Sequence, residues 1–221
     1  MAKTKSRRRN SPTAHKSRRV VAREEFRGQN TVALARSLLG KVLVRSGADG
    51  RIEGIITEVE AYHTAADLAC HASKGRTKRT ELLFGPAGIW YVYLCYGIHE
   101  MLNLVTGPAK HPAAILIRGI QGVSGPGRVT RHLSVDRRLN GAPARPESGL
   151  HVEDWGLVIP RGRIVAGPRV GIDYAGPVWA AKPWRFRVAD DIFGSADQRP
   201  DGSDGSPPVG LARRAETDTG S

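Results

Sequence analysis

The sequence predicts a single α+β domain with a curved, mostly antiparallel β-sheet core, flanking helices and a protruding β-hairpin. Short apolar, β-branched runs are numerous and few helices alternate with them, which argues against a doubly wound parallel sheet. The 221 residues, 40% of them hydrophobic, suffice for one core and are too few for two large domains. An aromatic run that ends at Tyr96 and Gly97, with a return run after it, indicates the hairpin.

The two ends of the chain differ in composition from its middle. Residues 1–20 are basic and almost devoid of apolar side chains, which predicts a disordered arm. Residues 191–221 are rich in Gly, Ser, Asp and Pro, which predicts a flexible tail. The folded domain is therefore expected over residues 21–190.

Local signals place the elements of this domain in order. A first helix is expected to begin after a cap at Asn30 or Thr31 and to end at Gly40. Its apolar face would consist of Leu34, Ala35, Leu38 and Leu39. The predicted strands cover residues 41–45, 51–61, 88–95, 101–106, 113–118, 157–159, 169–172 and 184–188. A second helix is expected from the Gly-Pro-Gly at 125–127 to about residue 139, with Pro126 in its first turn.

The charge of the chain favours a polyanionic partner. Lys and Arg number 34 against 21 Asp and Glu, which gives a net charge of +13 and a pI near 10.4. Ten of these cations and only two of the acids lie in residues 1–27. A basic surface attracts nucleic acid through counterion release, so DNA or RNA is the leading partner.

Other features exclude whole classes of protein. No apolar run is long enough to cross a bilayer, and the basic N-terminus has no apolar segment after it, so neither a membrane protein nor a secreted one is expected. Two cysteines, Cys70 and Cys95, are too few for a disulfide framework. The seven histidines form no metal motif, so we expect no metal and no cofactor. With so few cysteines, a reducing, cytoplasmic setting is expected.

The run RIEGIITEVEAY at 51–62 holds two candidate catalytic carboxylates. Strict strand alternation would place Ile56, Glu58 and Glu60 on one face, and Ile55, Thr57, Val59 and Ala61 on the other. Both glutamates could be surface charges at a strand end, which the pattern alone favours. Alternatively, one of them is a general base, and the pattern does not distinguish the two.

The predicted hairpin carries the other candidates. Tyr96 at its tip could fold back onto the hairpin, or it could enter the DNA stack as a wedge when a base is extruded. Tyr91 and Tyr93 share one face of the preceding strand and could line a stacking pocket, although the pattern favours core packing.

Seven segments together resemble the alkyladenine DNA glycosylase family, also called the 3-methyladenine or methylpurine DNA glycosylases. The segments are ARSLLGKVLVR (35–45), EVEAYHTAADLACH (58–71), YVYLCYGIHEMLN (91–103), AAILIR (113–118), GPGRVTRHL (125–133), RVGIDYAG (169–176) and AKPWRFRV (181–188). They extend the resemblance from about Phe26 to Val188, and their order and spacing make it specific.

The resemblance assigns a role to individual residues. It implies that Glu60, and not Glu58, activates the water, and that Arg118 helps to hold that water. It further implies a base pocket lined by Tyr62, His71, Tyr93 and Asn103, with Asn103 hindering the exocyclic amine of guanine. Tyr96 would be the intercalating residue. No lysine occupies a nucleophile position of the family, so no Schiff base and no lyase step are expected.

The function implied is that of a monofunctional DNA glycosylase of base excision repair. After base flipping it would hydrolyse the N-glycosidic bond of purines such as 3-methyladenine, 7-methylguanine, hypoxanthine and ethenoadenine, and leave an abasic site. Its partner would be double-stranded DNA with damaged purines, and it would act as a monomer without a membrane. The alternatives are a non-catalytic lesion- or DNA-binding protein and an RNA-binding protein that uses its tyrosines for stacking.

Overall fold

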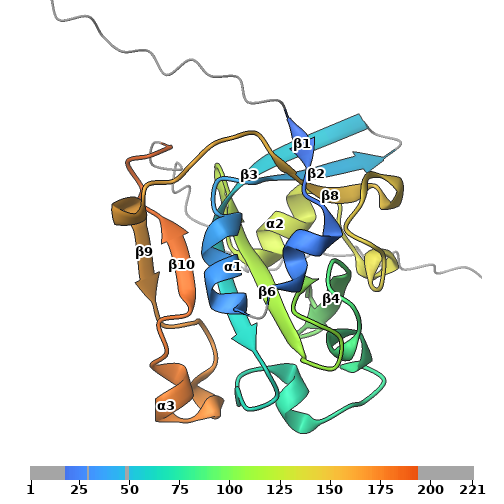
Figure 1. The fold of residues 1–221 in the computed structure, drawn as a ribbon, viewed down its shortest axis with the longest axis vertical. Helices are drawn as coiled ribbons and strands as arrows, with labels where there is room; N and C mark the ends of the chain where they lie inside the picture. Colours follow the sequence, from blue (N-terminus) through green and yellow to red (C-terminus); the bar gives the residue numbers. More distant parts are fainter. Residues whose placement is uncertain (1–17, 29, 48–49, 194–221) are drawn as a thin grey trace, which may run out of the picture.

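The computed structural model describes residues 18–28, 30–47 and 50–193, which form one α+β domain (Figure 1). Its ten strands belong to one sheet, in which every strand pair is antiparallel. The strands are β1 (Arg19–Val20), β2 (Val42–Gly47), β3 (Gly50–His63), β4 (Trp90–Cys95), β5 (His99–Val105), β6 (Ala113–Ile120), β7 (Val123–Ser124), β8 (Leu150–Asp154), β9 (Ile164–Gly167) and β10 (Arg185–Val188). The predicted fold class is confirmed.

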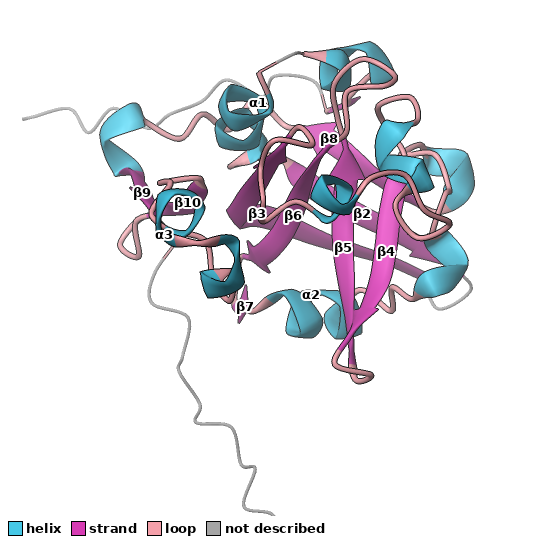
Figure 2. Cartoon of the chain, turned by 90° about the horizontal axis from the view of Figure 1, so that it is seen from below, coloured by secondary structure: helices cyan, strands magenta, loops and turns pink. Residues whose placement is uncertain are grey.

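Helices cover the sheet and connect its strands. The α-helices are α1 (Thr31–Leu38), α2 (Pro126–His132) and α3 (Pro177–Ala180). Short 3-10 helices span Arg23–Arg27, His71–Lys74, Glu81–Phe84, Arg137–Leu139, Pro146–Ser148, Arg161–Arg163 and Asp173–Ala175. Helix α1 packs on β3 and β6, and α2 packs on β5 and β6. The β4–β5 hairpin projects beyond the rest of the sheet (Figure 2).

Strand β3 is long enough to pair with β2 along its first part and with β6 and β10 along its last part, so it connects the two halves of the sheet. The main path of the sheet runs β1-β8-β2-β3-β6-β5-β4. The first part of β3 pairs with β2, and its last part lies between β6 and β10. Glu60, near the end of β3, is therefore opposite Leu116 on one side and Arg185 on the other. A residue at this position is held by two neighbouring strands.

The hydrophobic core lies between the sheet and the helices. Its largest fully buried side chains include those of Phe26, Leu43, Trp90 and Phe186. The Trp90 indole N–H donates a hydrogen bond of 2.8 Å to the Leu150 carbonyl, which ties the hairpin to β8. The base of the hairpin is thus fixed, whereas its tip projects from the sheet.

Local signals located α1 correctly. The Asn30 side chain accepts a hydrogen bond from the Ala33 N–H at 2.9 Å, as expected of a cap. Ala35, Leu38 and Leu39 of the predicted apolar face are buried, and Gly40 follows with a φ of 84°.

Three predicted elements were wrong. The second helix ends at His132 and not near residue 139, because Ser134 has a φ of 50° and Asp136 caps a separate 3-10 helix. Residues 157–159 and 169–172 are not strands. Strands β8 and β9 were not predicted; β8 lies between β1 and β2 in the sheet, and β9 pairs with β10.

Strand β8 was missed because its sequence, LHVED, looks like a polar loop. In the structure His151 and Glu153 are buried together, with His151 Nε2 2.9 Å from a Glu153 carboxylate oxygen. Arg51 and the Trp155 indole N–H also donate to that carboxylate. Such partners offset the cost of burying the Glu153 carboxylate, and they come from β3 and from the residue that follows β8.

The ends of the predicted domain extend slightly beyond their expected limits. Within the predicted arm, Arg19 and Val20 form β1, and Arg19 pairs with Glu25 at 2.6 Å and with Asp154 at 3.3 Å. Within the predicted tail, Ile192 and Phe193 pack against the core. The remainder of both segments, residues 1–17 and 194–221, lies outside the described residues, as do residue 29 and the turn residues 48–49.

Membrane insertion by a helix finds no support in the described part of the chain. No helix there combines the length and the apolar character that crossing a bilayer requires.

Candidate active site

A bulge in β3 changes which of its side chains face the core and which share a face with the two glutamates. The pairing of β3 with β6 shifts register between Ile56 and Glu58 and again between Glu58 and Val59. Ile56, Val59 and Ala61 consequently all enter the core, although strict alternation had placed Ile56 on the glutamate face. A register shift moves the following side chains to the opposite face of the sheet. The predicted alternation was therefore wrong at Ile56, while Glu58 and Glu60 do share a face.

Glu60 is fully buried, with an exposed fraction of 0%, and hydrogen bonds hold both of its carboxylate oxygens. The Tyr62 hydroxyl donates to Oε2 at 2.9 Å, and the Val170 backbone N–H donates to Oε1 at 2.8 Å. Arg118 Nη1 lies 3.4 Å from Oε1. The sequence pattern had favoured surface charges, but Glu60 is instead an oriented, buried carboxylate.

The surroundings of Glu60 shift its ionisation toward the range in which a base works. Burial raises the pKa of Glu60 above its ordinary value of 4.5. The Arg118 charge, the Val170 N–H and the Tyr62 hydroxyl lower that pKa but do not cancel the effect of burial. Burial also raises the pKa of Tyr62 well above 10.0, so its hydroxyl stays protonated and remains a donor. A carboxylate with a raised pKa is a stronger proton acceptor once it is ionised.

Arg118 lies between the two glutamates. On β6 it follows Leu116, the partner of Glu60, by two residues, so it points to the same face. Its Nε donates to Glu58 Oε1 at 3.1 Å, while its Nη1 faces Glu60. Arg185 on β10 also lies 3.6 Å from Glu58. Glu58 thus forms ion pairs with Arg118 and Arg185, whereas Glu60 is the carboxylate beside the cavity.

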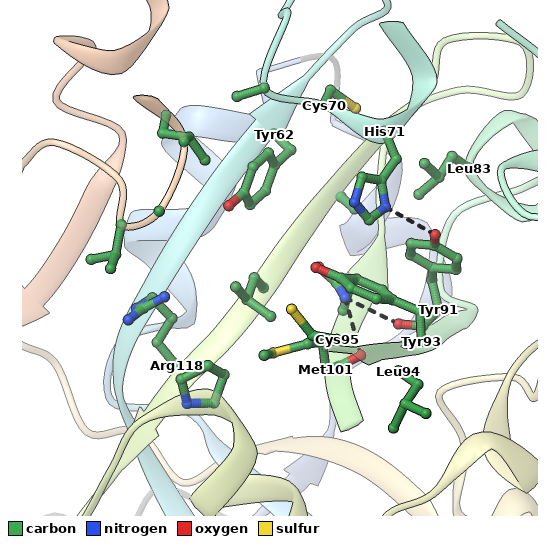
Figure 3. Close-up of a pocket in the computed structure, with 18 of the residues that line it drawn as sticks. Tyr62, Cys70, His71, Leu83, Tyr91, Tyr93, Leu94, Cys95, Met101 and Arg118 are labelled. Atoms are coloured by element: carbon green, nitrogen blue, oxygen red, sulfur yellow. Dashed lines mark hydrogen bonds between the residues drawn. The ribbon is translucent and has the colours of Figure 1, made fainter. Parts of the chain in front are cut away.

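A cavity of about 440 Å³ is bordered by residues that contact Glu60, and Figure 3 shows side chains that line it. This volume falls in the range of roughly 300–1,000 Å³ that is usual for small-molecule sites. Tyr62, Arg118 and Val170, which all contact Glu60, line the cavity. The carboxylate therefore lies directly behind the cavity wall.

Aromatic rings form two walls of the cavity. Tyr62 lies on one side, and His71, Tyr91 and Tyr93 lie on the other (Figure 3). The His71 and Tyr93 ring centroids are 4.7 Å apart. His71 Nδ1 is 3.1 Å from the Tyr91 hydroxyl oxygen. Burial, together with the charge of Arg79, lowers the pKa of His71 to about 4, so the imidazole is neutral at neutral pH.

The floor of the cavity includes Asn103 of β5. Its side-chain amide donates to the carbonyls of Tyr91 and Met101, both at 3.2 Å. The residue is only 4% exposed. Two backbone acceptors thus prevent the amide from rotating within the cavity.

Tyr96 stands at the tip of the hairpin. It is 89% exposed, and its φ of 50° together with the φ of 72° at Gly97 forms the turn between β4 and β5. The side chain does not fold back onto the hairpin, yet it also borders the cavity. An exposed tyrosine beside a cavity is suitably placed for a wedge.

A metal centre finds no support in the part of the chain that is described. There, no three His, Cys, Asp or Glu side chains are grouped so that they could hold an ion. Cys70 at the cavity wall is a poor ligand as well, because burial raises the pKa of its thiol to about 11.

The family model for methylpurine-DNA glycosylase matches residues 25–124 and 119–192 of this chain. The chain belongs to this family. Curated relatives agree, and each bears the name "Putative 3-methyladenine DNA glycosylase".

Three of these glycosylase relatives illustrate the similarity. The protein from Anaeromyxobacter sp. (strain Fw109-5) is 43% identical over 176 residues, which cover 76% of this chain and 89% of the relative. That from Methanocella arvoryzae is 44% identical over 186 residues, with 75% and 91% covered. That from Myxococcus xanthus is 42% identical over 176 residues, with 76% and 89% covered.

In this methylpurine-DNA glycosylase family member, the predicted site residues come together around one cavity. Lining it are Tyr62, His71, Tyr93, Tyr96, Asn103 and Arg118, and Glu60 lies behind Tyr62 and Arg118. Tyr91, for which the pattern favoured core packing, also lines the cavity, and sequence reasoning missed the Val170 N–H and the guanidinium of Arg79. A backbone donor leaves no signal in composition, while Arg79 is hidden within a run of surface cations at 74–79.

A buried ion pair supports the Val170 donor. Arg169 and Asp67 both have side chains that are 0% exposed, and the guanidinium contacts both carboxylate oxygens, at 2.5 and 2.8 Å. Arg169 also donates to the Ala61 carbonyl at 2.9 Å, and its guanidinium carbon is 4.8 Å from the Tyr62 ring centroid. Because Val170 follows Arg169, this pair fixes the segment that presents the N–H to Glu60.

Proposed function

We propose that this chain is a monofunctional DNA glycosylase that releases damaged purines from double-stranded DNA after base flipping. The observation that carries the proposal is a buried, hydrogen-bonded carboxylate behind the wall of an aromatic cavity. Glu60 has the raised pKa of a general base, and the cavity has stacking surfaces on both sides. Membership in the methylpurine-DNA glycosylase family supports the same conclusion.

In the proposed reaction Glu60 accepts a proton from the attacking water. A carboxylate has about four acceptor sites, and Tyr62 and Val170 occupy two, so capacity remains for a water that Arg118 also holds. As the C1′–N bond lengthens, positive charge develops on the sugar, and the Glu60 carboxylate stabilises it. Positioned proton transfer of this kind contributes roughly 10²–10⁴-fold to the rate.

The aromatic walls would recognise the flipped base by stacking. Tyr62 faces His71 and Tyr93 across the cavity, so a planar purine would lie between them. The fixed amide of Asn103 would hinder a purine that carries the exocyclic amine of guanine. Damaged bases that pair poorly cost less to extrude, which adds selectivity.

Hydrolysis, and not a lyase reaction, is the chemistry we propose. A lyase step requires an amine that forms a Schiff base with the sugar. Of the described residues that line the cavity, none is a lysine. Borohydride should therefore trap no covalent enzyme–DNA adduct.

A labelled duplex with one hypoxanthine or ethenoadenine, together with bulk methylated DNA, tests this function. We expect release of the free base, with strand breaks only after alkali treatment. Tight binding of every one of these substrates without release of any base would instead identify a non-catalytic lesion-binding protein.

The pH profile of excision should follow the ionisation of Glu60. Activity requires the carboxylate, so the rate should fall as the pH drops through the raised pKa of Glu60. The Arg118 charge lowers that pKa, so Arg118→Gln should move the acid limb of the single-turnover rate to higher pH. An unmoved limb would mean that Arg118 does not act on Glu60 through its charge.

Replacement of Tyr96 should weaken base flipping without loss of stability. Aromatic stacking on a base is worth about 1–3 kcal/mol, so Tyr96→Ala should slow single-turnover excision roughly tenfold or more. Its Tm should not change, because the side chain is exposed. Tyr96→Trp should retain most of the activity. Equal excision rates and equal stopped-flow flipping signals in Tyr96→Ala would exclude the wedge.

A further inference from the structure

The charged side chains of the described cavity lining are all cationic. Among the described lining residues are two cations, Arg79 and Arg118, and neither an Asp nor a Glu. Arg118 is paired with Glu58 and Glu60 behind the wall. For Arg79, by contrast, no carboxylate of the described chain lies within ion-pair distance. The uncompensated charge of the cavity is therefore that of Arg79.

Arg79 acts on the aromatic wall formed by His71, Tyr91 and Tyr93. Its guanidinium carbon lies 5.2 Å from the centroid of the Tyr93 ring. After burial, the charge of Arg79 is the second cause of the lowered pKa of His71. Burial raises the pKa of Tyr91, and Arg79 opposes that shift. The field of Arg79 thus reaches the surface on which a base would stack.

The Tyr62 ring on the opposite wall also lies beside a guanidinium, whose charge Asp67 balances. The Arg169 guanidinium lies 4.8 Å from the Tyr62 ring centroid, in the buried layer behind the cavity. Aromatic rings attract cations through their electron-rich faces. Because the uncompensated guanidinium of Arg79 already lies over the Tyr93 ring, that ring has less attraction left for a cationic base.

We propose that Arg79 is a specificity-determining residue that favours neutral purine lesions over cationic alkylated purines. This inference rests on the proposed function and deepens it. A purine methylated at N7 or N3 carries a positive charge in DNA, which Arg79 repels. Hypoxanthine and ethenoadenine are neutral and meet no such repulsion.

The same charge assists the departure of a neutral base. When the C1′–N9 bond breaks, its electron pair moves to the purine, the water oxygen bonds to C1′, and the water proton moves to Glu60. A neutral lesion thereby acquires negative charge, which Arg79 stabilises where it develops. A cationic lesion leaves as a neutral base and gains nothing from Arg79.

The test compares Arg79→Gln with Lys78→Gln, a matched loss of one charge in the same surface segment but outside the cavity lining. Single-turnover excision is measured on duplexes of one sequence that carry either 7-methylguanine or hypoxanthine. In Arg79→Gln the ratio of the 7-methylguanine rate to the hypoxanthine rate should rise about tenfold, as expected for one charge near the base. In Lys78→Gln the ratio should equal that of the wild type.

Two results would overturn the inference. An equal loss on both substrates would show that Arg79 binds the DNA backbone, and an unchanged ratio would show that its charge does not reach the base. Equilibrium binding of both duplexes to Glu60→Gln, with and without Arg79→Gln, measures the preference without bond cleavage. Wild type that cleaves neither substrate would refute the proposed function, while the binding ratio would still decide the role of Arg79.

Discussion

Glu60→Gln is expected to lower the single-turnover rate of base excision by about 10²–10⁴-fold while lesion-containing DNA still binds. The amide fills the same space but accepts no proton from water and carries no charge to stabilise the sugar cation. The Val170 N–H can still donate to the amide oxygen, and the Tyr62 hydroxyl can turn to accept from the amide N–H, so the cavity should keep its shape. Rates come from gel analysis after alkali treatment, and affinities come from fluorescence anisotropy.

Glu53→Gln is the matched control on the same strand. Glu53 is exposed at the start of β3, where it pairs with Arg51 at 2.6 Å, and its register partner is Val44 of β2. The variant should excise bases at the wild-type rate. If Glu60→Gln were as active as Glu53→Gln, Glu60 would not be the base.

Glu60→Gln should also reveal that the ionised carboxylate lowers the stability of the folded protein. The folded-state pKa of Glu60 is raised, so the folded protein loses stability as the pH rises from the ordinary value of 4.5 to that raised pKa. Glutamine does not ionise, and the stability of the variant relative to wild type should therefore increase from acidic to neutral pH. Urea unfolding at both pH values measures this difference. A constant difference would indicate that Glu60 has an ordinary pKa.

Loss of either partner of the Asp67–Arg169 pair is expected to destabilise the fold by about 3–5 kcal/mol. Both side chains are fully buried, so the partner left behind would be an uncompensated charge. Asp67 additionally accepts the backbone N–H groups of His63 and Ala69, at 3.2 and 3.1 Å. Arg169→Met and Asp67→Leu should each show the loss in denaturant unfolding.

The double variant separates stability from positioning. Replacement of a whole buried pair by apolar residues is often neutral, so Asp67→Leu/Arg169→Met should recover part of the lost stability. Its excision rate should nevertheless stay low, because nothing then fixes the Val170 N–H on Glu60. A folded double variant with wild-type activity and an unchanged pH profile would show that the pair has only a structural role. Arg19→Met, at an exposed pair with Glu25, is a control that should cost about 1 kcal/mol or less.

Much of the fold could be predicted because short-range physics specifies it. The Asn30 cap and Gly40 delimit α1, and the β-branched and aromatic runs define β4 and β6. Elements that depend on distant partners could not be predicted in this way. Strand β8 buries Glu153 beside His151, and Arg51 and the Trp155 indole N–H donate to the Glu153 carboxylate from outside the strand.

The candidate site likewise combines features that local sequence specifies with features that depend on distant parts of the chain. By itself, the sequence determined the fold class, the hairpin with its tip at Tyr96 and the basic character of the chain, because these follow from local patterns and composition. Its resemblance to a family singled out Glu60 over Glu58, which alternation did not separate.

Only the tertiary structure decided what surrounds those residues. The bulge in β3 moves Ile56 into the core and leaves Glu60 beside the cavity. A segment more than 100 residues away supplies the Val170 donor and Arg169, the partner of Asp67. Burial depth, and with it the raised pKa of Glu60, arises when the sheet, the hairpin and the 169–172 segment pack together. Desolvation is a property of the packed structure and not of any single stretch of chain.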